Sequence, residues 1–119
     1  MRHNILPERV AEIVSVMRQS EQGFFELSSK EGTYCALGCI AEAYRRAFPH
    51  SCNWVTSSNL ISFDIAGDRC RSKLPIEVLI WAAGDYHASI FIDRECISTL
   101  NDAKKYTLNE FADILEGKL

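Results

Sequence analysis

The central helix of the fold is predicted by residues 32–44, which read Gly32-Thr33-Tyr34-Cys35-Ala36-Leu37-Gly38-Cys39-Ile40-Ala41-Glu42-Ala43-Tyr44. Thr33 is the expected N-cap, because its hydroxyl can accept a backbone N–H of the first turn. Apolar residues recur at helical spacing along this stretch, and Pro49 stops the helix. Gly38 costs about 1 kcal/mol relative to alanine inside a helix. We therefore expect a neighbouring backbone to approach it closely, which makes this helix central.

Three other segments carry clear helical signals. Residues 7–23 combine a proline at the first helical position with an apolar stripe at helical spacing. Residues 75–84 begin with proline and close with glycine. Residues 107–117 open with a capping box, in which Thr107 is followed three residues later by Glu110. We expect a helix in each segment.

Strand signals are shorter and fewer. Apolar and polar residues alternate over 61–65, which is typical of a half-buried strand. The polar stretch 68–73 is expected as a solvated loop, with an anion contact as the alternative. Residues 86–100 fit a strand and a helix equally well, and we favour a short strand followed by a short helix from about Glu95.

These elements predict an α+β fold, mainly α, with about four helices around a small two- to three-stranded antiparallel sheet. The 119 residues fit one globular domain, 1–119, that can bury its own core. No apolar run approaches the ~18 residues of a membrane span, and no apolar stretch follows the N-terminal charges. We expect a cytoplasmic protein with no membrane contact. The net charge of −3 argues against nucleic acid as a partner.

The five cysteines are odd in number and irregularly spaced, so we expect reduced thiols. A zinc site is weighed and set aside, because Cys35 and Cys39 form one pair on a helix and no second close pair exists. No glycine-rich phosphate loop is present. We expect neither a metal nor a cofactor.

Three motifs in order resemble a family of small proteins from bacteriophages, prophages and some bacterial genomes. They are residues 32–44, then 74–84 (Leu-Pro-Ile-Glu-Val leading into Trp-Ala-Ala-Gly), then Leu100-Asn101-Asp102 with residues 107–116. The family pattern runs from "C-[CA]-L-G" through "LP-x-x-V-x-x-WAG" to "LND" and "F-x-x-IAD-x-IE". The resemblance implies a phage-borne accessory protein, a class that includes inhibitors of host defence, located in the bacterial cytoplasm.

The expected function is non-enzymatic binding of a host protein or a small signalling ligand. Five basic residues are the candidate contact surface: Arg45, Arg46, Arg69, Arg71 and Lys73. Such a group would suit an acidic protein or a phosphorylated ligand if the five side chains met in space. The sequence leaves open whether copies of the chain associate.

An enzymatic alternative rests on Cys35, His87 and Asp102. A thiol at a helix start gains nucleophilicity from the helix dipole, and a histidine with an acidic partner could serve as its base. This order resembles papain-like hydrolases and transferases. The opposing interpretation has Cys35 and Cys39 packed in the core, and Asn101 and Asp102 closing the turn that aims the last helix.

Overall fold

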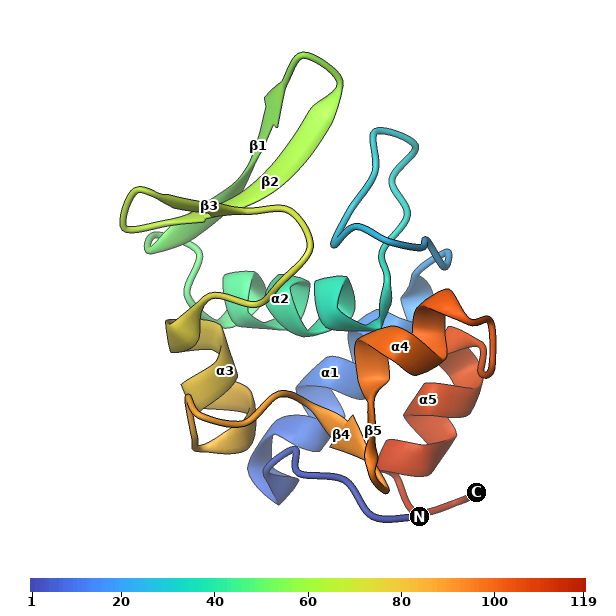
Figure 1. Ribbon diagram of the computed structural model, residues 1–119. Coiled ribbons are helices and arrows are strands. Elements are labelled where there is room, and N and C mark those ends of the chain that lie inside the picture. The colour runs from blue at the N-terminus through green and yellow to red at the C-terminus, as the bar shows by residue number, and fades with distance from the viewer.

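The computed structural model describes residues 1–119 and confirms an α+β fold that is mainly α (Figure 1). Its elements in chain order are α1 (Pro7–Gln19), α2 (Ala36–Ala47), β1 (Cys52–Ser57), β2 (Leu60–Ile65), β3 (Asp68–Cys70), α3 (Ile76–Ala83), β4 (Phe91–Ile92), β5 (Glu95–Cys96), α4 (Ile97–Asp102) and α5 (Leu108–Leu115). The short helix expected from about Glu95 is α4, and the two short strands β4 and β5 precede it.

Helix α2 occupies the centre of the molecule, as its sequence predicted. All residues from Ala36 to Ala43 are buried. The three-stranded sheet lies on one side of α2, and the other helices lie on the opposite side (Figure 1). A Cβ at Gly38 would overlap the carbonyl oxygen of Leu27, so the expected close approach of a neighbouring backbone is confirmed.

Helix α1 packs between α2 and α5 and buries the predicted apolar stripe. Its two ends are tied to other helices by arginines. The Nε of Arg9 donates to the carbonyl of Trp81 in α3 at 3.0 Å. Arg18 near the C-terminal end pairs with Asp113 at 2.7 Å and with Glu116. The N- and C-terminal helices therefore close one side of the core.

The larger sheet is antiparallel in the order β1-β2-β3. The predicted strand 61–65 lies within β2, but the expectation of a loop over 68–73 is wrong for Asp68–Cys70, which forms β3. The cause is the two-residue turn at Ala66 and Gly67, where both residues have positive φ. A turn of this kind matches strand twist and forms a hairpin.

Two of the predicted helix caps are confirmed, and the predicted N-cap of α2 is wrong. Gly84 closes α3 in the left-handed conformation, and Thr107 and Glu110 form both bonds of the expected capping box of α5. The N-cap of α2, however, is Cys35. The Thr33 hydroxyl instead shares a 2.6 Å hydrogen bond with the hydroxyl of Ser29, four residues before it.

Candidate functional site

The thiol of Cys35 is a helix cap in the core. Its Sγ accepts the backbone N–H of Gly38 at 3.3 Å, and the residue is 5% exposed. Burial raises the pKa of the Cys35 thiol to about 11 and outweighs the opposing effect of the backbone N–H groups. A thiol in this state is protonated near neutral pH, whereas a catalytic cysteine needs a lowered pKa.

Asn101 is fully buried and organises the start of α2. Its Oδ1 accepts the backbone N–H of Ala36 at 3.1 Å and the Nε2 of Gln22 at 2.9 Å. Its Nδ2 donates to the carbonyl of Gly23 at 3.0 Å and to Asp102 Oδ1 at 3.1 Å. Asn101 and Asp102 lie within α4 and connect it to α2 and the 23–35 loop. The expectation that they close the turn before α5 is therefore wrong.

The three residues of the enzymatic alternative have separate partners. Asp102 Oδ1 accepts the backbone N–H of Phe25 at 2.9 Å. His87 is exposed, its backbone N–H donates to Asp85 at 2.8 Å, and its ring contacts that of Tyr86 in a tilted arrangement. No hydrogen bond joins Cys35 to His87, so the papain-like arrangement stays a prediction without support from these contacts.

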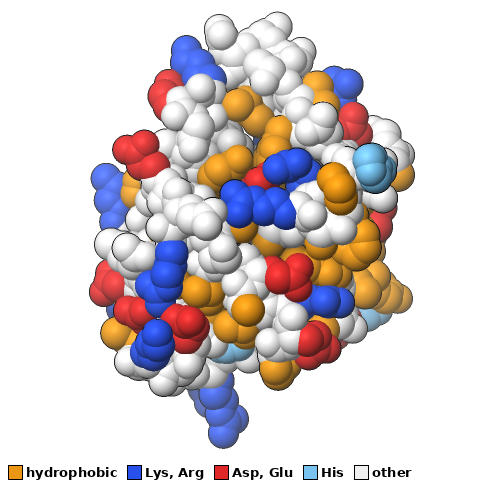
Figure 2. Space-filling model, turned by 180° about the vertical axis from the view of Figure 1, so that it is seen from behind, with side chains coloured by type: hydrophobic (Ala, Val, Ile, Leu, Met, Phe, Trp, Pro, Cys, Tyr) orange, Lys and Arg blue, Asp and Glu red, His pale blue; other side chains and the backbone are white.

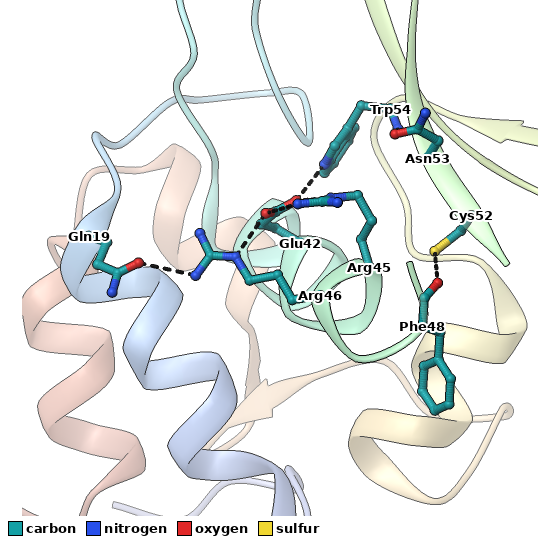
Figure 3. A network of polar contacts seen from close by, with 8 residues as sticks. All are labelled: Gln19, Glu42, Arg45, Arg46, Phe48, Cys52, Asn53 and Trp54. Atoms are coloured by element: carbon teal, nitrogen blue, oxygen red, sulfur yellow. Dashed lines mark hydrogen bonds and ion pairs between the residues drawn. The ribbon is translucent and has the colours of Figure 1, made fainter. Parts of the chain in front are cut away.

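Arg45 and Arg46, two of the five candidate basic residues, surround one buried carboxylate (Figure 3). Glu42 accepts the Nε of Arg45 at 2.7 Å, the Nε of Arg46 at 2.9 Å and the indole N–H of Trp54 at 2.9 Å. Burial raises the pKa of Glu42, but these bonds outweigh it and hold the pKa at about 2. The network fixes the sheet to α2 and leaves these arginine charges partly neutralised.

The remaining basic residues lie elsewhere. Arg69 pairs with Asp64 at 3.7 Å and sits opposite it in the sheet register. Trp54, which reaches down to Glu42, points to the other face of the same sheet because side chains alternate along a strand. Arg71 and Lys73 take part in no ion pair. The five basic residues are thus divided over different surfaces.

The largest concavity of the molecule, which we call the main cleft, has a volume of about 310 Å³. It forms where the segment after β3, helix α3, the segment before β4 and the starts of α2 and α4 converge. Its lining residues are Leu37, Ser72, Lys73, Leu74, Leu79, Tyr86, His87, Ala88, Ser89, Ile90 and Ser98. The cleft brings together Lys73 and His87, which the sequence had assigned to two different hypotheses.

The main cleft contains basic side chains and no acidic ones. Lys73 and His87 are its only charged or titratable groups besides the Tyr86 phenol, and no carboxylate lines it. Three serines, Ser72, Ser89 and Ser98, also line it and carry hydroxyl groups that can donate and accept hydrogen bonds. Its apolar part comes mostly from leucine and isoleucine side chains. Such a lining suits an anionic group attached to an apolar body.

A second hollow of about 220 Å³ adjoins the segment after β3. It is lined by Arg69 and Lys73, with Asp68 among the other residues. Lys73 therefore borders both concavities. The acidic side chain and the ion pair of Arg69 with Asp64 reduce the net positive charge there, so the main cleft is the better anion site.

Sequence reasoning missed most residues of the main cleft. Tyr86, Ser89 and Ser98 lie in the ambiguous segment 86–100, and no motif marks them as site residues. The one available signal is the polar stretch 68–73, which contains Ser72 and Lys73 and for which an anion contact is the alternative to a solvated loop. The meeting of residues 72–74 with 86–90 is a tertiary contact that no local pattern encodes.

No group of three or more His, Cys, Asp or Glu side chains is placed to hold a metal ion, and all five cysteines are free. None of the helices has both the length and the apolar character needed to cross a membrane. Comparison with known protein families, curated proteins and solved structures found no match to this chain.

Proposed function

We propose that this protein is a non-enzymatic binding protein that holds a small anionic ligand in the main cleft. The observation that carries the proposal is the position of Lys73, which lines the cleft and takes part in no ion pair. Lysine amines near the surface attract anions, and a neighbouring carboxylate would compete for the charge. His87 and the serine hydroxyls supply further hydrogen-bond donors beside it.

The binding role is favoured over catalysis by the state of the available nucleophile. Cys35 does not line the main cleft, and burial raises its pKa to about 11. The cleft contains serines and a histidine, but no hydrogen bond links His87 to a serine hydroxyl. Nucleophilic catalysis needs such a bond between nucleophile and base. A ligand would therefore leave the cleft chemically unchanged.

The wider role in this proposal is that of a phage-type accessory protein. The support is the order of the three sequence motifs that resemble phage and prophage proteins. A protein that sequesters a small signalling molecule would remove it from a host defence pathway. In a bacterium whose phage defence depends on a small anionic signal, the wild-type chain should restore plaque formation and Lys73→Gln should not.

The direct test of the proposed function is an NMR titration of the folded protein with a mixed library of small compounds. Backbone amide shifts should concentrate in residues 72–74 and 86–90, and the compounds recovered afterwards should have unchanged mass. Ser98→Phe, which fills the cleft, should abolish these shifts, while Ser57→Phe on the exposed end of β1 should not. Shifts confined to other surfaces, or a chemically altered compound, would contradict the proposal.

A protein partner is a second candidate function, favoured by one apolar surface. Phe48 is 40% exposed, and Ile76 and Ile80 on α3 are 58% and 43% exposed. Tyr44 connects them, because its ring contacts Phe48 at 4.7 Å and Trp81 of α3 at 5.5 Å between centroids. Figure 2 shows hydrophobic side chains gathered on the side of the molecule that carries α3. Contiguous apolar surface of this kind is typical of interaction sites.

This second function predicts a specific sensitivity to charge on α3. Three proteins would be cross-linked in bacterial lysate: the wild type, Ile80→Asp and Leu60→Asp. The last is the control, because Leu60 is an exposed leucine at the tip of the β1–β2 hairpin. A genuine partner should be lost with Ile80→Asp and kept with Leu60→Asp. Equal recovery with all three proteins would remove this surface from consideration.

A further inference from the structure

The main cleft is lined both by a lysine without an ion-pair partner and by an aromatic pair, and we infer that its ligand is a molecule no larger than a mononucleotide that joins one anionic group to a flat ring. This inference rests on the proposed function, since it names the ligand class of the same cleft. It is carried by three properties of the lining: the lysine in the absence of any carboxylate, the exposed aromatic pair and the volume.

The anionic group is assigned to Lys73 and the adjacent Ser72. Lys73 makes no ion pair, in contrast to Arg45, Arg46 and Arg69, which all contact carboxylates. A phosphate or carboxylate placed beside Lys73 would receive a charge-assisted hydrogen bond from its ammonium group and a further bond from the hydroxyl of Ser72. The shared chemistry is an oxyanion, and phosphate and carboxylate are its two sources.

The ring is assigned to Tyr86 and the apolar lining residues. The Tyr86 and His87 rings are tilted by 42° with 3.8 Å between centroids, and Tyr86 is 54% exposed. Leu37 and Leu79 supply apolar surface in the same cleft. Aromatic faces beside an apolar wall favour flat rings, because stacking adds to the burial of apolar area.

The volume sets an upper limit on the ligand. At about 310 Å³ the main cleft is at the lower end of the range of ~300–1,000 Å³ for small-molecule sites. A molecule with a single ring and a single charged group fits this space. A molecule that contains two nucleotides would have to leave one of them outside the cleft.

The test measures the affinity of the full chain for matched probes by calorimetry, with NMR shifts to locate each probe. Phenyl phosphate combines both groups, inorganic phosphate carries only the charge, and phenol carries only the ring. Phenyl phosphate should bind at least about tenfold more tightly than either half. Benzoate distinguishes the sources: weaker binding than phenyl phosphate assigns the site to phosphate, and tighter binding assigns it to carboxylate. Adenosine monophosphate and a dinucleotide together probe the size limit. Adenosine monophosphate should bind, and the dinucleotide should bind no more tightly than it does.

Two substitutions test the assignment of the anionic group to Lys73 and of the ring to Tyr86. Lys73→Gln should weaken phenyl phosphate about tenfold and leave phenol unchanged, while Lys30→Gln, at an exposed lysine outside the cleft, should change neither. Tyr86→Ala should weaken phenol and phenyl phosphate but not inorganic phosphate. If phenol binds as tightly as phenyl phosphate while the cleft amides still shift, this ligand class is overturned and the proposed function stands. If neither these probes nor the compound library shifts the cleft amides, the ligand class and the proposed function are both overturned.

Discussion

The side chain of Asn101 accepts the backbone N–H of Ala36 at 3.1 Å, although the two residues are 65 positions apart in the sequence. Ala36 is the first residue of α2, and its N–H is one of the groups that a helix start leaves without an intrahelical partner. Asn101 thus completes the cap that Cys35 begins with its bond to Gly38. The short helix α4 thus contributes this amide as well as the buried side chains of Ile97 and Leu100.

Asn101→Ala should lower the free energy of unfolding by about 2–4 kcal/mol, because it strands buried backbone groups of Ala36 and Gly23 that cost ~1–3 kcal/mol each without partners. Urea denaturation of the purified variant measures the change. The matched control is Asn109→Ala, whose exposed side chain has only a 3.4 Å contact with Arg18. Surface substitutions of this kind stay within about 0.5 kcal/mol. Equal stabilities of the two variants would contradict the capping role.

Gly38→Ala should destabilise the protein by about 3 kcal/mol or more, although alanine is the better helix former by ~1 kcal/mol. The added methyl group would overlap the carbonyl of Leu27, which is backbone and can yield only if the 23–35 loop moves. Gly32→Ala is the control, since nothing lies within 4 Å of its added Cβ and only the positive φ of 82° opposes it. Its cost should be about 1–2 kcal/mol. Thermal unfolding of both variants measures whether Gly38→Ala is the more destabilising of the two.

Local patterns predicted those parts of the fold that local physics determines. The apolar stripe of α1, the capping box of α5 and the left-handed Gly84 depend on residues within a few positions of one another. The central position of α2 followed from Gly38, because a glycine inside a helix indicates close backbone contact. The cap of α2 was assigned to Thr33 rather than Cys35, since the competing bond of Thr33 to Ser29 depends on the path of the loop.

The candidate site was less accessible from sequence because its residues meet only through tertiary packing. Lys73 and His87 were both noted, but for unrelated reasons, and their chain segments converge only when α3 folds back on α2. The pairing of Arg45 and Arg46 with Glu42 could have been anticipated, because residues three and four positions apart share a helix face. That spacing argues against including these two arginines among the five basic residues of the candidate contact surface.

Glu42 should make stability depend on pH in the acidic range. Its pKa in the folded protein is about 2, against an ordinary value of 4.5. A carboxylate with a lowered pKa stabilises the fold fully above the unfolded value, and the contribution is lost as pH falls from about 4.5 through about 2. The contribution is on the order of 3 kcal/mol at neutral pH. Denaturation at a series of pH values measures it.

Glu42→Gln isolates this contribution from that of other carboxylates. The variant should be less stable than wild type at pH 7, and the gap between the two proteins should narrow as the pH approaches 2. Glu116→Gln is the control, because its partner Arg18 is a surface residue and such ion pairs contribute little. If Glu116→Gln reproduced the pH-dependent gap and Glu42→Gln showed none, the buried network would not be the source.

Cys35 should resist alkylation in the folded protein, because its thiol is 5% exposed and burial raises its pKa to about 11. Iodoacetamide labelling followed by mass spectrometry should modify Cys96, the only cysteine that is not buried, well before Cys35. Cys35→Ser should remain folded, since serine is a good N-cap for the same Gly38 N–H, whereas Cys35→Ala should lose about 1 kcal/mol. Rapid labelling of Cys35 with a midpoint below pH 8 would instead indicate an activated thiol. The papain-like alternative would then regain its nucleophile, and the cap would be a secondary role of that sulfur.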